Sequence, residues 1–248
     1  MTLTDMTEND YQDLRKAVYT LENPGFTAAV ADLIGTPIEK VMKLLPAKAS
    51  KSIDKVTEAA LQKALNLAVF SMKEGKTPAS PGLHKFAAAA SGAIGGAAGL
   101  PGLAIELPIT TTIIFRSIAD IARAEGEDLT DPFASLACLE VLAYGGRSDN
   151  DDAVDSCYFA TRVALAHAVK DAAQYIVKGI VQKEAAPMLV QLISKIAARF
   201  GIVVSYKAAA QMAPVIGALG GAVVNTMFMD HFQSMAKGHF TVRRLERV

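Results

Sequence analysis

Two long segments of this chain are nearly free of charge and rich in alanine and glycine. Residues 87–115 carry a single ionisable side chain, Glu106, and residues 208–229 carry none. About 20 consecutive apolar residues are enough for a helix to cross a lipid bilayer. Apolar surface on this scale has to be buried in a protein core or in lipid, because its exposure to water is unfavourable. These two segments therefore constrain the fold more than any other feature of the sequence.

Several features disfavour a simple membrane-spanning role for the two segments. Pro101, Pro108 and Pro214 are expected to interrupt the helices, which leaves backbone groups that need partners inside the protein. The flanking charges lack the asymmetry that orients membrane helices. Alanine and glycine also make both segments less hydrophobic than a leucine-rich span. We expect helices that pack in a bundle or insert shallowly in a membrane surface.

Glycines at a spacing of four residues occur in both segments. This spacing places two glycines on one helix face and lets another backbone approach closely. A glycine inside a helix costs about 1 kcal/mol relative to alanine, so its use needs a reason. Close helix packing is one interpretation; packing around a bound acyl chain, or a hinge, is the other. The pairs are Gly92 and Gly96, Gly95 and Gly99, and Gly217 and Gly221.

The rest of the chain has helical periodicity as well. Thr7 and Asp10 form a weak N-terminal capping signal, Asn23-Pro24-Gly25 ends a first helix, and Gly35 interrupts a second. Sustained period-two alternation, which is typical of strands, is absent from the sequence. The predicted helices outside the apolar segments are residues 7–22, a helix from Phe26, and residues 50–74, 133–145, 151–182 and 188–200.

The sequence therefore predicts an all-α fold, a multi-helix bundle with two buried Gly/Ala-rich segments. We expect one domain over residues 1–248, with amphipathic helices in residues 1–82 and the glycine-rich core in residues 83–248. The polar, acidic N-terminus has no basic region followed by an apolar run, which predicts a cytoplasmic chain. The two cysteines, Cys138 and Cys157, are expected to be buried thiols.

Composition excludes several functional classes. Lys+Arg and Asp+Glu both number 25, so the chain lacks the basic excess of a nucleic-acid-binding protein. The four histidines form no HExxH or HxxxH pattern, and His231 and His239 are too far apart along one helix to share a metal. No phosphate-binding glycine motif follows a strand. We expect neither a metal nor a cofactor.

Glu106 is the strongest single candidate for a functional residue. A buried carboxylate is costly unless it is paired or neutralised, and Arg116 is the nearest cation that follows it along the chain. Glu106 could bind a lipid headgroup or a substrate, or it could belong to a structural ion pair or face backbone amides. The candidate ligand-binding residues are Gly95, Gly96, Gly99, Glu106, Pro108, Arg116, Gly217, Gly221 and Asn225.

Two other groups of side chains suggest weaker hypotheses. His167 and Asp171 are four residues apart and could form an oriented base, although a surface polar pair explains them better. The C-terminal residues Arg243, Arg244 and Arg247 could contact anionic lipid, but they would form only a small patch. Because the GxSxG motif of serine hydrolases is absent, catalytic residues are not assigned from the sequence.

Three stretches of the sequence resemble the EcsC family: residues 22–46, 92–129 and 213–247. The most specific part is the glycine-rich run that leads into Glu106-Leu107-Pro108. The resemblance implies a bacterial origin and an all-helical fold. It also implies an association with an ABC-type transport system, and some relatives carry a hydrolase label.

These observations together favour a membrane-associated or lipid-binding helical protein. It would lie in the cytoplasm, at or partly inserted in the inner membrane, with lipid or a transporter as its partner and no nucleic acid. A hydrolase that uses Glu106, His167 or a serine is the alternative from a different class. An interaction module for a membrane transport system is the third.

Overall fold

The fold of the chain was analysed in a computed structural model. Every regular element in the described part is a helix and no strand occurs there, which confirms the predicted all-α bundle. The structure describes residues 6–37, 40, 42–43, 47–70, 84–91, 99–146, 158–178, 187–212 and 217–247. The helices are α1 (Glu8–Glu22), α2 (Phe26–Ile34), α4 (Ala47–Phe70), α6 (Gly99–Ala124), α7 (Pro132–Glu140), the 3₁₀ helix η2 (Val141–Ala143), α8 (Tyr158–Val177), α9 (Pro187–Met212) and α10 (Gly217–Arg247); residues 84–91 are also helical.

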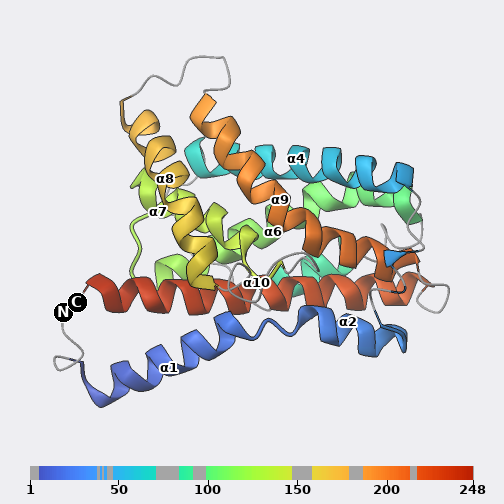
Figure 1. The fold of residues 1–248 in the computed structure, drawn as a ribbon, viewed down its shortest axis with the longest axis horizontal. Coiled ribbons are helices and arrows are strands. Elements are labelled where there is room, and N and C mark those ends of the chain that lie inside the picture. The colour runs from blue at the N-terminus through green and yellow to red at the C-terminus, as the bar shows by residue number, and fades with distance from the viewer. Residues whose placement is uncertain are drawn as a thin grey trace.

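Helix α10 is the longest element and runs through the middle of the bundle (Figure 1). Helices α1 and α2 cover one side of it, and α6 and α9 pack against it on the other. Helix α4 lies outermost on that second side, against both α6 and α9. Helices α7 and α8 pack together at the end where α10 finishes. The long apolar helices α6 and α9 therefore lie between α4 and α10.

The ends of the N-terminal helices follow from local sequence signals. The Asp10 backbone N–H donates to Thr7 Oγ1 at 3.2 Å, and the Thr7 N–H donates to Asp10 Oδ2 at 3.3 Å, so the predicted cap forms a capping box. Helix α2 begins at Phe26 as predicted and ends at Gly35, whose φ of +67° is a left-handed conformation that glycine adopts at little cost.

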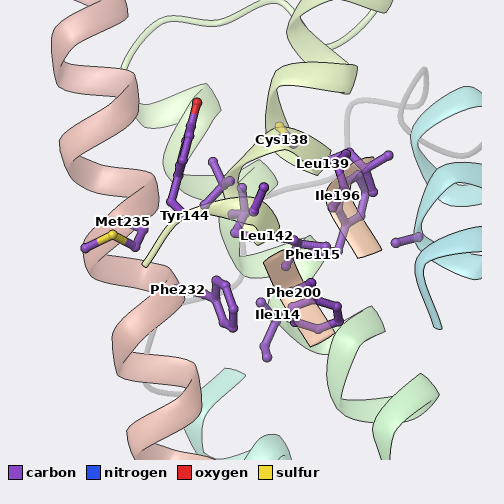
Figure 2. Close-up of a cluster of buried hydrophobic side chains, with 14 of the residues drawn as sticks. Ile114, Phe115, Cys138, Leu139, Leu142, Tyr144, Ile196, Phe200, Phe232 and Met235 are labelled. Carbon is purple, nitrogen blue, oxygen red and sulfur yellow. The ribbon is translucent and has the colours of Figure 1, made fainter. Parts of the chain in front are cut away.

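Figure 2 shows the part of the core where α6, α7, α9 and α10 meet; α4 and α8 add further buried residues such as Leu61 and Leu165. Phe200 of α9 packs against Phe228 and Phe232 of α10, with ring centroids 6.0 and 5.6 Å apart. Ile114 and Phe115 of α6 are fully buried in the same cluster. Aromatic rings bury a large area each, so these contacts join three helices that are distant in sequence.

One expectation about the apolar segments was wrong. Pro108 does not interrupt its helix, because α6 continues from Gly99 to Ala124 around it; Pro101 sits in the first turn, where a missing N–H costs little. The second segment is divided between two helices, since α9 ends at Met212 and α10 begins at Gly217, which agrees with the interruption expected near Pro214. Pro214 itself lies outside the described residues, as do the ends of the predicted helix 151–182.

Close helix packing at glycine is visible at a position that the four-residue spacing does not include. A Cβ atom added to Gly238 of α10 would lie 2.7 Å from Leu21 Cγ of α1, closer than real contacts allow. Gly92, Gly95 and Gly96 lie outside the described residues. Gly99 and Gly217 are the first residues of α6 and α10, and Gly221 is buried. Close helix packing at the glycines that are four residues apart therefore remains a prediction.

Candidate functional site

Glu106 lies on the inner face of α6 and forms an ion pair with Lys207 of α9. The Lys207 ammonium donates to both carboxylate oxygens, at 2.8 Å to Oε1 and 2.7 Å to Oε2. The exposed fractions of the two side chains are 2% for Glu106 and 0% for Lys207. The pair is therefore enclosed by the bundle and shielded from solvent.

Arg116, the next cation along the chain, is not the partner of Glu106. In a continuous α6, ten residues correspond to a rise of about 15 Å, and Arg116 is exposed at the surface. Lys207 comes just before the second apolar segment and is 101 residues from Glu106, so proximity along the chain does not indicate it. A usable signal was present, since Lys207 is the only charged residue in the apolar stretch 200–217.

Two polar side chains complete the coordination of the Glu106 carboxylate. Asn225 Nδ2 of α10 donates to Glu106 Oε1 at 2.7 Å and to the Ala88 carbonyl at 2.9 Å. The Thr110 hydroxyl, one turn along α6, donates to the same carboxylate oxygen. Four elements therefore meet at one carboxylate: the helix at residues 84–91, α6, α9 and α10. Asn225 was a predicted site residue, and the structure places it beside Glu106.

A hydroxyl chain leads from the carboxylate towards the surface. Ser91 Oγ lies 2.7 Å from Thr110 Oγ1. Because the only hydroxyl proton of Thr110 is directed at Glu106, the Ser91 hydroxyl can donate its single proton either to Thr110 Oγ1 or to the Ala88 carbonyl, 3.1 Å away. Ser91 is half-buried, whereas Thr110 is fully buried. We name Glu106, Lys207, Asn225, Thr110 and Ser91 the charge cluster.

The charge cluster is a neutral unit made of two opposite charges. Burial alone raises the pKa of the Glu106 carboxyl, but the Lys207 ammonium and the bonds from Thr110 and Asn225 hold that pKa below its usual value. Burial lowers the pKa of Lys207, and Glu106 opposes this effect. The Lys207 ammonium also lies 4.8 Å from the centroid of the Phe228 ring, which favours the cation.

A carboxylate bound in this way is a poor general base, because its depressed pKa opposes protonation. Its clearest physical effect is positional. Lys207 fixes the C-terminal half of α9 to α6 and α10, and Ala208, Ala209 and Ala210 are buried beside it. The N-terminal half of α9 buries Leu192, Ile193 and Ile196 on its inner face and exposes its outer face. Its exposed residues are Pro187, Met188, Val190, Gln191, Ser194, Lys195 and Ala198.

The remaining predicted residues do not converge on the charge cluster as a set. Pro108 is half-buried in α6, and its carbonyl accepts a hydrogen bond from Thr112 Oγ1 at 2.7 Å. Gly95 and Gly96 lie outside the described residues. His167 and Asp171 are both exposed on α8, as a surface polar pair would be.

The C-terminal arginines are engaged in ion pairs within the protein. Arg243 donates to both oxygens of Glu127, at 2.8 and 3.1 Å. Arg244 pairs with Glu125 and Asp13, each at 2.8 Å, and Arg247 pairs with Glu127. The expectation that these arginines contact anionic lipid is therefore not supported by their surroundings.

Three histidines have structural contacts that the sequence did not predict. His84 Nε2 lies 2.9 Å from Asp120 Oδ2, His231 Nε2 lies 3.2 Å from the Tyr144 carbonyl, and His239 Nδ1 lies 2.9 Å from the Tyr158 hydroxyl. Cys138 is buried, as expected, and burial raises the pKa of its thiol. Among the described residues, no group of three or more His, Cys, Asp or Glu is arranged to hold a metal ion.

The fold and the charge cluster define an all-helical bundle that carries a neutralised ion pair between its most apolar helices. The model of the EcsC protein family matches residues 8–245, so the chain belongs to that family. This confirms the resemblance found in the sequence. Neither the curated proteins nor the solved structures contain a match to this chain.

Proposed function

We propose that this EcsC-family protein is a membrane-associated protein that binds the lipid surface through apolar helix faces. Among the described residues, two helices are long and apolar enough to cross a membrane: Pro101–Ala124 in α6 and Pro187–Gln211 in α9. Length and composition alone are weak support, because the core helices of soluble proteins have the same properties. The burial of each helix supplies the further argument.

The single observation that carries the proposal is the exposure of α9. The apolar window of α6 is 61% buried, as suits a core helix, whereas that of α9 is only 33% buried. A Cβ atom added to Gly201 of α9 would meet no atom within 4 Å. The large exposed apolar side chains of α9 are Met188 and Val190 in its first turn, and exposed apolar patches mark partner or membrane contacts.

The charge cluster supports surface binding over a complete crossing of the bilayer. For α9 to span the membrane alone, Lys207 would have to leave Glu106, and breaking a buried ion pair costs about 3–5 kcal/mol. The body of α9 can stay in the bundle while the exposed side chains of its first turn, Met188 and Val190, meet lipid.

Cell fractionation followed by a carbonate wash tests this proposal. A surface-bound protein sediments with membranes and is released by carbonate, whereas a spanning protein stays in the pellet. Purified full-length protein should also float with lipid vesicles in a density gradient. A protein that stays in the soluble fraction and does not float would contradict membrane association.

The hydrolase, apolar-ligand-binding and transporter-partner functions remain predictions. No observation favours the hydrolase alternative, since Glu106 is held by Lys207 and His167 lies on the surface. Binding of an apolar ligand between the glycine segments depends on residues 92–98, which lie outside the described part. A transporter partner is a prediction for pull-down experiments.

A further inference from the structure

Exposed apolar side chains gather where α8 ends and α9 begins. Val177, the last residue of α8, is 63% exposed; Met188 and Val190, in the first turn of α9, are 40% and 47% exposed. Helices α8 and α9 pack against each other, and these ends leave the bundle together, beyond α4 and α7 (Figure 1). We name Val177, Met188 and Val190 the hairpin end.

Exposed lysines flank the hairpin end along both helices: Lys178 is next to Val177, Lys170 is seven residues before it on α8, and Lys195 is five residues after Val190 on α9. Lys170, Lys178 and Lys195 are all exposed, and Asp171 is the only acidic residue within 170–178 and 187–199. None of the three lysines forms an ion pair within the described part of the chain. The hairpin end is therefore an apolar surface with an excess of free positive charge at its margin.

We propose that the hairpin end is the surface that docks on an anionic lipid bilayer. This inference rests on the membrane association proposed above and names the surface and the lipid class. Apolar side chains of this size enter the boundary between headgroups and acyl chains, and exposed lysines bind lipid phosphates there. Long lysine side chains reach the headgroups while the valines and the methionine stay in the apolar layer.

Two other groups of exposed apolar residues differ from the hairpin end. Phe86, Ile105 and Ile109 are exposed, but Lys85, next to Phe86, is already paired with Asp230. Val163 of α8 is 72% exposed, more than Val177, yet it precedes Val177 by 14 residues, about 21 Å along the helix. Val163 therefore provides a matched control on the same helix.

Vesicle flotation with full-length protein tests the docking surface. The vesicles contain phosphatidylcholine alone or phosphatidylcholine with phosphatidylglycerol. The unchanged protein is expected to float with the anionic vesicles, and added salt should lower the bound fraction because it screens the lysines. Val177→Glu should lower binding about tenfold or more, since it removes apolar contact and adds repulsion, whereas Val163→Glu should stay within about twofold.

The outcomes separate this inference from the proposed function. An unchanged protein that floats with neither vesicle overturns membrane association itself. An unchanged protein that floats while Val177→Glu floats equally well overturns only the assignment of the hairpin end. Equal binding to both vesicle types overturns the preference for anionic lipid. Circular dichroism and thermal melting of both variants confirm that each is folded.

Discussion

Glu106 and Glu140 are both buried glutamates, but their surroundings are opposite. Glu106 is enclosed by Lys207, Thr110 and Asn225, and its pKa lies below the usual value. Glu140 ends α7, and its Oε1 has no hydrogen-bond partner among the described residues. Burial raises the pKa of Glu140 to about 7, against the weaker lowering by the neighbouring Tyr144 hydroxyl and by Arg162 and Arg243.

The difference shows that the partner, rather than burial, decides the charge of a carboxyl group in this core. Desolvation penalises both carboxylates, but only Glu106 has an ammonium within 3 Å to offset the penalty. The groups that act on Glu140 are the Tyr144 and Tyr158 hydroxyls and the guanidinium groups of Arg162 and Arg243, none of which forms an ion pair with it. The Tyr144 hydroxyl points away from the apolar cluster and has no partner among the described residues, and Tyr158 is bonded to His239 (Figure 2). The core therefore contains an ion pair at Glu106 and Lys207, whereas the carboxyl group of Glu140 has a pKa close to neutral pH.

Removal of Lys207 should have the largest effect. Lys207→Ala leaves the Glu106 carboxylate buried without its cation, which should lower the free energy of unfolding by about 3–5 kcal/mol in urea denaturation. Lys195→Ala, on the exposed part of the same helix, should change it by no more than about 0.5 kcal/mol. The double variant Glu106→Gln with Lys207→Met should recover much of the loss, because no charge is left unpaired. Equal effects of the two lysine variants would contradict the assignment.

Glu140 should make stability fall as the pH rises. Its folded pKa, about 7, exceeds the ordinary value of 4.5, so its contribution is complete below pH 4.5 and is lost as the pH rises towards 7. The loss amounts to about 3 kcal/mol for this shift. His231, whose pKa is lowered by burial to about 4, acts in the opposite direction, since its contribution is lost as the pH falls below 6.5.

Because these two slopes oppose each other, the test is a difference between variants. The free energy of unfolding of Glu140→Gln minus that of the unchanged protein should rise between pH 4.5 and 7.5. Urea denaturation at a series of pH values measures it. A difference that does not depend on pH would show that Glu140 titrates normally in the folded protein.

Two adjacent threonines on α6 provide a second comparison between a buried polar group with a partner and one without. Thr110 and Thr111 are both fully buried, but only Thr110 bonds to Glu106, whereas Thr111 Oγ1 has no partner among the described residues. Thr110→Val should cost about 1.5–3 kcal/mol, because a hydrogen bond to a charged group is lost. Thr111→Val should be neutral or stabilising, and thermal melting distinguishes the two. A costly Thr111→Val would mean that its hydroxyl has a partner after all.

Arg116→Ala should have the smallest effect. Arg116 is exposed and remote from Glu106, so its removal should change the free energy of unfolding by no more than about 0.5 kcal/mol. Urea denaturation measures this change, and the effect of Lys207→Ala serves as the comparison. A loss of several kcal/mol would restore Arg116 as a partner of Glu106.

Much of the secondary structure was predictable because its causes are local. The capping box at Thr7, the start of α2 at Phe26 and its end at Gly35 each depend on a few neighbouring residues. Pro108 is the exception. Proline disfavours a helix interior locally, but the packed neighbours of α6 hold the helix continuous around it.

The importance of Glu106 was also readable from the sequence, since a lone acid in a long apolar segment needs compensation. The identity of its partner was not. Lys207 is 101 residues away, and only the packing of α6 against α9 and α10 brings the two charges together.

The sequence alone determined that this chain is a helical bundle with two apolar segments and one costly buried acid, because periodicity and composition act over short distances. Only the tertiary structure decided which apolar helix is covered, since α6 and α9 are both apolar enough to cross a membrane but only α6 is mostly enclosed by its neighbours. Burial is a property of the neighbours as much as of the helix, and neighbours are set by long-range packing.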